Sequence, residues 1–314
     1  MGPSGFSKRF ERMARNPSSC APRPGELLSD ETWGLPPWDS SLEVCSARDA
    51  VVENGRVVSL SLSGRAFVSS AHDLFQEHPI RSLRLVAVAP FLTEVANCER
   101  LSGLTRLDLF GNQLGPEGLK QLLASPFLAN LRELGLGRNG LGTPGIEELL
   151  NWRGREKIRR LDLQGNGLLA DDVHRLFGSS KWPELSGLVL SENALGPKSV
   201  ESLFQLPLAE LEIEGIELGT SGAVHLAESG LKPINLNLGF NRIGDKGIAE
   251  LVRSELLAKC TVLDLRGNLI RSADPFVDSP MLRNVRSLDL RANPFDDDAV
   301  SKLRHRFGRA VILS

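Results

Sequence analysis

Several residue types and features are scarce or missing in this sequence. Its 314 residues include no tyrosine, three methionines and four cysteines, and aromatic residues make up only 5%. Cys20, Cys45, Cys98 and Cys260 lie far apart and form no C-x-x-C pair, so we predict neither a zinc site nor a disulfide framework. No run of about 18 apolar residues is present, and we therefore expect no membrane-spanning helix.

A strong excess of charge of either sign is also missing. The 37 lysines and arginines nearly balance the 39 aspartates and glutamates, which gives a net charge of −2. Strongly basic proteins bind nucleic acid through its phosphates, so this balance leads us to expect no nucleic-acid partner. No apolar stretch follows the basic residues near the N-terminus, and no secretory signal peptide is predicted. Together with the scattered cysteines, these features favour a cytoplasmic protein without a membrane partner.

An internal repeat dominates the sequence. The pattern L-x-x-L-x-L-x-x-N is first complete over residues 104–112, and most later copies follow at steps of about 27 residues. The repeated asparagines, which we call the ladder asparagines, are Asn112, Asn139, Asn166, Asn193, Asn241, Asn268 and Asn293. Three copies depart from the pattern: one has Ile216 at the asparagine position, and two degenerate copies begin around Leu60 and Leu83. We count ten copies in all.

Each copy predicts one strand followed by one helix. The L-x-L stretch alternates with period 2, which indicates a short strand with its leucines facing inward. Apolar residues three and four apart after the asparagine, such as Leu119, Leu122 and Leu123, indicate a helix. One unit of this size cannot bury its own apolar faces, so neighbouring units must stack. Parallel strands lie about 4.8 Å apart while helices need about 8–10 Å, and the stack must therefore curve with its strands on the concave side.

The ladder asparagines have a structural role in such a stack. The chain turns sharply between strand and helix, and this turn leaves backbone N–H and C=O groups inside the stack. A carboxamide carries both donors and acceptors, so an inward-facing asparagine can satisfy groups of both kinds. We therefore predict that these side chains form a ladder of hydrogen bonds through the protein.

These residues resemble leucine-rich repeat proteins of the ribonuclease-inhibitor-like subclass, especially bacterial ones found in large paralogous sets. Residues 69–85 resemble the first repeat of those proteins, and residues 303–313 resemble their final cap. The resemblance covers roughly residues 45–314. It implies an α/β fold: a curved, right-handed horseshoe of about ten repeats with a parallel sheet on the concave face and helices outside.

The sequence also predicts how the chain is divided. Residues 1–30, which are rich in basic residues, proline, serine and glycine, are predicted to form a disordered N-terminal segment. Residues 31–57 are predicted to form an N-terminal cap that contains a hairpin with an Asn54-Gly55 turn. The repeats then occupy residues 58–295, and residues 296–314 form a C-terminal cap.

No arrangement of residues in the sequence predicts catalysis. Gly135, Gly137 and Gly140 match the dinucleotide pattern G-x-G-x-x-G, but the repeat already accounts for all three. The five histidines show no metal-ligand spacing, and no G-x-S-x-G nucleophile motif is present. We therefore predict no catalytic, cofactor-binding or metal-binding residues, no cofactor and no small-molecule substrate, so the protein is not expected to be an enzyme.

The surface most suited to binding is the predicted concave face. The strand residues that flank the inward leucines point to it, and its middle column is acidic. The candidate partner-binding residues are Arg106, Asp108, Phe110, Glu133, Arg160, Asp162, Glu210, Glu212, Glu214, Asp264, Arg266, Asp289 and Arg291. They include eight acidic and four basic residues, for a sum of −4. One interpretation is a groove for a partner with a basic surface. The other, which we call the repeat-sequence interpretation, is that L-D-L is a common sequence in such repeats and has no role in binding.

Two features of this face stand out. The cluster of Glu210, Glu212 and Glu214, which precedes Ile216, is the least generic part. Phe110 and Phe240 are candidate apolar anchors, although either can instead pack at the edge of a strand. The sequence thus predicts a non-catalytic scaffold that binds a protein partner through the concave face and adjoining loops. The alternative is a regulatory, inhibitory or substrate-adaptor subunit of an enzyme.

Overall fold

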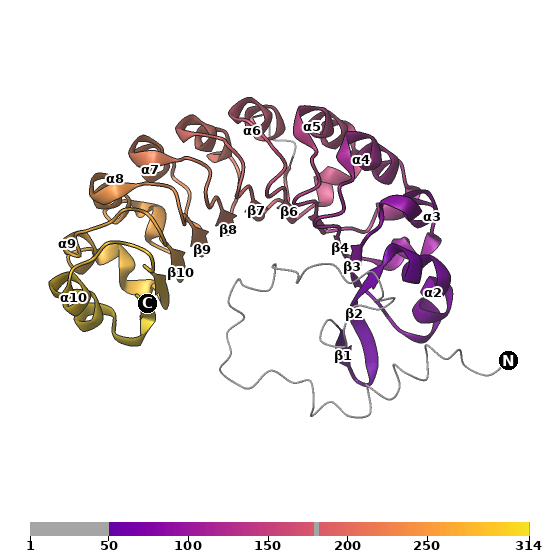
Figure 1. Ribbon diagram of the computed structural model, residues 1–314, viewed down its shortest axis with the longest axis horizontal. Helices are drawn as coiled ribbons and strands as arrows, with labels where there is room; N and C mark the ends of the chain where they lie inside the picture. The colour runs from indigo at the N-terminus through magenta and orange to yellow at the C-terminus, as the bar shows by residue number, and fades with distance from the viewer. Residues whose placement is uncertain (1–49, 179–181, 314) are drawn as a thin grey trace.

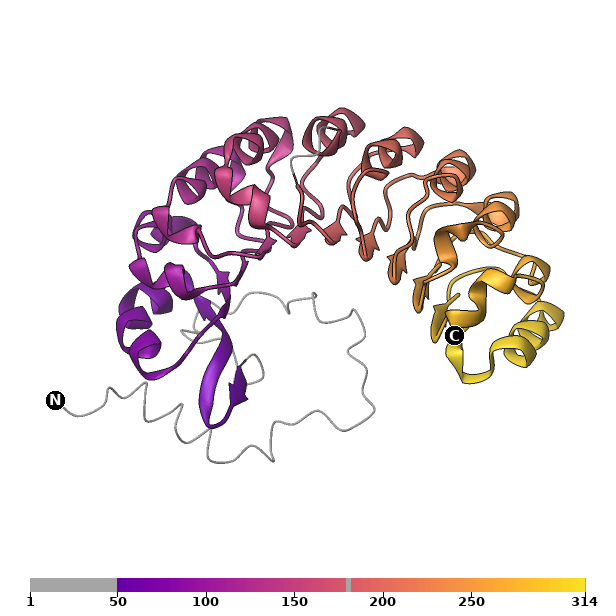
Figure 2. The ribbon, with the colours of Figure 1, turned by 180° about the vertical axis from the view of Figure 1, so that it is seen from behind.

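The computed structural model describes residues 50–178 and 182–313, and these form one curved stack of strand–helix units. A sheet of 12 strands runs through the stack, with the strands side by side in sequence order. In Figures 1 and 2 the strands line the inner side of an arc and the helices form its outer side. The narrow spacing of strands and the wider spacing of helices produce this curvature.

Ten of the strands belong to the repeats and are paired in parallel. The repeat strands are β2 (Arg56–Ser63), β3 (Ser82–Val86), β4 (Arg106–Asp108), β5 (Glu133–Gly135), β6 (Arg160–Asp162), β7 (Gly187–Val189), β8 (Glu210–Glu212), β9 (Asn235–Asn237), β10 (Val262–Asp264) and β11 (Ser287–Asp289). The register places equivalent leucines side by side, as Leu134 beside Leu161. The predicted α/β solenoid of about ten repeats is confirmed.

Helices follow the strands along the outer side. The α-helices are α2 (Gly64–Glu77), α3 (Leu92–Ala96), α4 (Gly115–Leu123), α5 (Gly142–Asn151), α6 (Ala170–Phe177), α7 (Gly219–Ala227), α8 (Gly244–Leu251), α9 (Asp274–Val277) and α10 (Asp297–Phe307). The 3₁₀ turns are η4 (Ala89–Phe91), η5 (Glu99–Gly103), η6 (Pro126–Leu128), η7 (Arg153–Lys157), η8 (Pro197–Leu203), η9 (Glu255–Leu257), η10 (Pro280–Asn284) and η11 (Gly308–Ala310). Among the described residues, no helix has the length and apolar character needed to cross a lipid bilayer.

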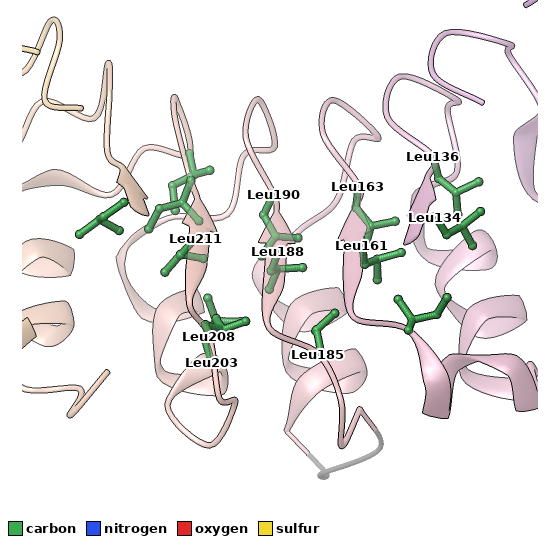
Figure 3. Close-up of a cluster of buried hydrophobic side chains, with 14 of the residues drawn as sticks. Leu134, Leu136, Leu161, Leu163, Leu185, Leu188, Leu190, Leu203, Leu208 and Leu211 are labelled. Atoms are coloured by element: carbon green, nitrogen blue, oxygen red, sulfur yellow. The ribbon is translucent and has the colours of Figure 1, made fainter. Parts of the chain in front are cut away.

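The leucines of the repeat form one continuous core between the sheet and the helices. Leu161, Leu163 and Leu188 are fully buried, and Figure 3 shows the leucines of neighbouring strands stacked in rows. Cys260 occupies a leucine position in this core and is fully buried. Burial raises the pKa of the Cys260 thiol to about 12, so this cysteine packs as an apolar side chain.

The ladder asparagines tie each repeat to the next, as Asn139 illustrates. Its Oδ1 accepts hydrogen bonds from the backbone N–H groups of Asn112 (3.1 Å) and Leu114 (3.2 Å) in the preceding repeat. Its Nδ2 donates to the carbonyl oxygens of Leu109 (2.9 Å) and Leu136 (3.0 Å). The residue before each ladder asparagine has a positive φ, for example 49° at Arg138, which produces the sharp turn.

The ladder is interrupted at Ile216, whose buried side chain cannot form hydrogen bonds. The copy between Asn193 and Ile216 is also four residues shorter than the usual 27. Its segment after the strand forms the 3₁₀ helix η8 where other copies have an α-helix. The N–H of Leu195 donates to the carbonyl of Asn193 within its own turn (2.9 Å). The stack therefore changes locally, while β7, β8 and β9 stay paired.

Both described ends of the stack are covered. At the N-terminal end, β1 (Val51–Glu53) pairs antiparallel with β2 through a turn at Asn54 and Gly55, both with positive φ. At the C-terminal end, Asp296 accepts a hydrogen bond from Ala299 N–H (2.8 Å) and begins α10. β12 (Val311–Ile312) then pairs with β11. The predicted segment 1–30, residues 31–49 of the predicted cap and residue 314 lie outside the described residues.

Candidate partner-binding surface

The concave surface is formed by the strand residues that alternate with the core leucines. Leu161 and Leu163 are fully buried in the core, and side chains alternate along a strand, so Arg160 and Asp162 face the concave surface. The structure places the predicted acidic and basic residues there, on β4 to β6, β8, β10 and β11 or just after these strands. It brings them together as neighbours across the parallel sheet.

The aspartates of the middle column are less available than the sequence suggests. Asp108, Asp162, Asp264 and Asp289 are only 6–9% exposed. Each Oδ1 accepts a hydrogen bond from the backbone N–H two residues later, at 2.9–3.0 Å. Asn237 makes the same bond at the same place in its repeat (2.9 Å). One oxygen of each aspartate therefore stabilises the end of its strand. This supports the repeat-sequence interpretation for that oxygen, in which the aspartate serves the repeat and not a partner.

Arg160 reaches across a whole strand to the glutamate cluster. From β6 it passes over β7 and pairs with Glu210 (3.2 Å) and Glu212 (2.9 Å) on β8. Gly187 lies beneath this bridge on β7. A Cβ at Gly187 would lie 3.1 Å from both the Arg160 Cγ and the Glu210 Oε2. The missing side chain on the middle strand thus lets residues two repeats apart meet.

Arg266 makes a matching bridge from the other side. It pairs with Glu214 at 3.2 Å, across the strand that carries Asn237, and with Asp264 at 2.8 Å. Asn237 also donates a hydrogen bond to Glu214 (3.0 Å). Gly239 lies between the bridge partners, and a Cβ there would be 3.4 Å from the Glu214 side chain. The glutamate cluster is therefore flanked by two arginines, and its charge is largely neutralised within the protein.

Sequence reasoning missed a third bridge, between Arg138 and Glu192. The Arg138 guanidinium donates to both carboxylate oxygens, with Nε–Oε2 3.0 Å and Nη2–Oε1 2.8 Å. Gln164 donates to the same carboxylate (2.8 Å), and Gly165 lies beneath the arginine. Both charged residues directly precede ladder asparagines, beyond the strand positions considered above. Their separation of 54 residues, two repeat steps with a glycine midway, is the signal that identifies such a pair.

The two candidate aromatic anchors have different environments. Phe110 is only 7% exposed; its ring packs over Gly137, and the Arg138 guanidinium lies 5.7 Å from the ring centre. It therefore packs at the edge of its strand and is not a free anchor. Phe240 is 50% exposed, with Arg266 lying 5.9 Å from its ring centre. Of the two, only Phe240 offers an aromatic surface to a partner.

Burial changes the titration of two aspartates on this surface. Burial raises the pKa of Asp162 to about 6, while its hydrogen bond from Gln164 opposes the change and the nearby charge of Asp108 adds to it. Burial likewise raises the pKa of Asp264 to about 6, against a hydrogen bond and an ion pair from Arg266. Both carboxyls are ionised at neutral pH, at a cost in free energy that the strand position imposes.

The described part of this surface has no arrangement suited to metal binding, and its glycine-rich segment has another role. Across residues 50–178 and 182–313, no group of three or more His, Cys, Asp and Glu side chains could hold a metal ion. In the G-x-G-x-x-G segment, Gly137 is covered by the ring of Phe110 and Asn139 belongs to the ladder. The segment is thus part of the sheet and its turn. Arg106 and Glu133 nearby form an ion pair at 3.3 Å.

Comparison with known proteins identifies the class of the fold. A family model described as "Leucine Rich repeat" matches residues 103–123 and 235–252. Each matched segment contains one strand and the helix after it, namely β4 with α4 and β9 with α8. Together with the parallel sheet and the asparagine ladder, this match defines the protein as an α/β leucine-rich repeat solenoid.

Two solved structures are similar to this chain to different degrees. A chain in the crystal structure of the Rad7 and Elc1 complex in yeast matches with a TM-score of 0.54 and 18% identity, over 81% of this chain and 71% of that chain. The leucine-rich repeat ectodomain of the Arabidopsis receptor kinase HAESA, solved with an N-terminally extended IDA peptide hormone, has a TM-score of 0.39 and 18% identity. That match covers 93% of this chain and 46% of the receptor chain. No curated protein matches the sequence.

Proposed function

We propose that this protein is a non-catalytic scaffold that binds a protein partner through its concave surface and adjoining loops. The main support is the concave surface: a continuous sheet of 12 strands presents polar side chains in fixed columns. The ladder asparagines and the arginine bridges hold neighbouring repeats in register, so the surface is ordered before a partner arrives. The structurally similar yeast protein was solved as a complex with another protein, which agrees with this use of the fold.

The finer assignment follows the sequence resemblance. We place the protein in the ribonuclease-inhibitor-like subclass, because most of its repeats carry an α-helix after the strand. A bacterial origin and a cytoplasmic location belong to the same proposal. The proposed partner is a protein; nucleic acids, membranes, cofactors and small-molecule substrates have no part in it.

The proposed partner has a basic surface. Among the predicted binding residues, eight carboxylates face four arginines, so a negative sum of −4 remains after internal pairing. A partner with complementary charge would associate faster and with better discrimination than a neutral one. The adjoining loops contribute Phe240, which is the exposed aromatic residue of the two considered above.

Affinity capture with the full-length chain tests the proposal. The variant Glu210→Gln/Glu212→Gln/Glu214→Gln removes three charges from the concave surface while keeping the side-chain shapes. The control, Glu117→Gln/Glu228→Gln/Glu250→Gln, removes three exposed charges from the helices or their ends. We expect captured proteins that depend on the concave residues and not on the control residues. Identical captures with wild type and both variants would contradict concave binding.

The same captures separate the scaffold from its alternative, a regulatory, inhibitory or substrate-adaptor subunit. If the captured partner is an enzyme, its turnover is measured with and without this chain. A change in turnover identifies the regulatory alternative, and unchanged turnover supports a scaffold.

A further inference from the structure

A small slot lies on the concave surface above β5. This strand presents Gly135 and Gly137 to the surface, between Asp108 on β4 and Asp162 on β6. A Cβ at Gly135 would lie 2.8 Å from the Asp108 Oδ1, and one at Gly137 would lie 3.2 Å from the Asp162 Oδ1. Gly137 is covered by the ring of Phe110, so the two carboxyl groups border a short gap at Gly135 that has no side chain of its own. Arg106, Glu133 and Arg160 complete the wall of the slot.

Asp162 differs from the other concave aspartates because, among the described residues, no cation lies within ion-pair distance of it, although the charges of Arg160 and Arg106 act on it from farther away. Among the described residues, Asp108 has Arg84 at 3.8 Å, Asp264 has Arg266 and Asp289 has Arg291. The Asp162 side chain is paired with none: its only hydrogen bond comes from the Gln164 N–H to Oδ1. Asp162 is 9% exposed and lines the slot, and none of the described residues donates a hydrogen bond to its second oxygen.

The arginines beside Asp162 are committed elsewhere. Arg160 pairs with Glu210 and Glu212, and Arg106 pairs with Glu133. Burying a carboxylate without an ion-pair partner costs free energy, and burial raises the pKa of Asp162 even though the charges of Arg160 and Arg106 lower it. A positive group entering the slot would recover part of this cost, because it meets a carboxylate whose water is already removed.

The size of the slot limits what that group can be. The space available to the centre of a water-sized group is about 20 Å³, which is enough for about one such group. An ammonium group is compact and has three donors, whereas a guanidinium is a larger planar fork. Two carboxylates without a third metal ligand do not form a metal site among the described residues.

We propose that the slot between Asp108 and Asp162 binds the terminal ammonium group of a lysine side chain from the protein partner. The ammonium donates to the second oxygen of Asp162 and to the Asp108 carboxylate, while the gap at Gly135 accommodates the end of the aliphatic chain. This inference rests on the proposed function and sharpens it. This lysine enters at Asp162, which has no ion pair within 4.0 Å among the described residues, whereas the capture variant tests a separate part of the surface, the glutamate cluster that Arg160 and Arg266 flank.

The test uses n-butylammonium, which reproduces the end of a lysine side chain. It is titrated into the full-length protein at pH 7.5 while the backbone amide signals of Gly135 and Gly137 are followed by NMR. Asp162→Asn removes the charge but keeps an oxygen for the Gln164 N–H, as Asn237 does at its own position. Asp264→Asn is the matched control, because Asp264 already has Arg266 as its partner.

We expect saturable shifts in wild type and Asp264→Asn, and binding at least about tenfold weaker in Asp162→Asn. Tetramethylammonium, which cannot donate a hydrogen bond, should produce no saturable shift. The proposal is overturned if n-butylammonium does not saturate the two glycine signals, if Asp162→Asn binds it as tightly as wild type, or if tetramethylammonium binds equally well.

These outcomes are independent of the capture experiment. Loss of the slot with continued concave capture would leave the scaffold function standing. Ammonium binding at the slot without any concave-dependent capture would overturn the scaffold function instead.

Discussion

Asp162 shows how one repeat position can serve the fold at a cost in stability. Its Oδ1 accepts the Gln164 N–H and stabilises the end of β6, but the same placement removes water from the carboxylate. The pKa of Asp162, about 6, lies above the 3.8 of an ordinary aspartate. The folded protein therefore holds a proton that the unfolded chain releases between pH 4 and 6. The contribution of Asp162 to stability is complete below pH 4 and is lost as the pH rises through 6.

Replacing Asp162 by asparagine should remove this dependence. Because asparagine keeps the acceptor and never ionises, we expect Asp162→Asn to be more stable than wild type at pH 7.5, by about 1–3 kcal/mol. The difference should shrink towards zero near pH 4. Urea unfolding of both proteins at the two pH values measures it. A variant that is less stable than wild type at pH 7.5 would show that the ionised carboxylate is not a burden.

Side chains on strands that are not immediate neighbours can form ion pairs where the strand between them carries a glycine. Arg160 on β6 reaches Glu212 on β8 because Gly187 on β7 leaves the space open. The arginine and glutamate side chains are 27% and 28% exposed, so the pair is shielded more than an ordinary surface salt bridge. The ion pair therefore connects β6 to β8 across the intervening strand β7.

A double-mutant cycle measures this ion pair. We expect Arg160→Ala and Glu212→Ala to be coupled by about 0.5–1 kcal/mol in the free energy of unfolding, and the coupling should decrease with added salt. In the background of Gly187→Leu the coupling should disappear, because the new side chain occupies the path of the arginine. Coupling that persists unchanged in that background would show that the two residues interact by another route.

The whole molecule behaves as a row of interlocked layers. Each repeat buries its leucines against the repeats on either side, so a central defect affects both neighbours. Leu163 is fully buried in a central repeat, while Leu269 is 57% exposed in a turn. The stack should therefore respond very differently to the same truncation at these two places.

We expect Leu163→Ala to lower the free energy of unfolding by about 2–5 kcal/mol, because it leaves a cavity between three packed repeats. Leu269→Ala makes the same chemical change at an exposed site and should cost less than about 0.5 kcal/mol. Chemical denaturation followed by circular dichroism compares them. Equal midpoints for the two variants would contradict the stacked core.

Most of the fold was predictable because it follows from spacing. The L-x-L pattern placed Leu134 and Leu161 in the core, and the recurring asparagine placed Asn139 at the turn. The exception was the copy before Ile216, which departs from the repeat pattern in the sequence without indicating the structure that results. Four missing residues leave that copy with η8 in place of an α-helix.

The sequence predicted where the residues of the candidate site lie, but not their ion pairs or their burial. Side chains alternate between the two faces of a strand, so the sequence predicts that Asp162 and Glu212 face the same surface. This alternation depends only on the local chain. Their partners depend on reach across two strands, on which middle strand carries a glycine, and on how much water burial removes. Gly187 and Gly239 leave space for two of the arginine bridges. Gly165 leaves space for the third bridge, between Arg138 and Glu192.

The periodicity of the sequence alone predicted ten strand–turn–helix units, with leucines inside and asparagines at the turns. Periodicity acts through near neighbours, and side-chain type and spacing are enough to specify it. The distribution of charge over the concave surface arose only when the units were stacked. Stacking brings residues 50 or more positions apart into contact, pairs Glu212 with Arg160 and leaves Asp162 without an ion pair among the described residues.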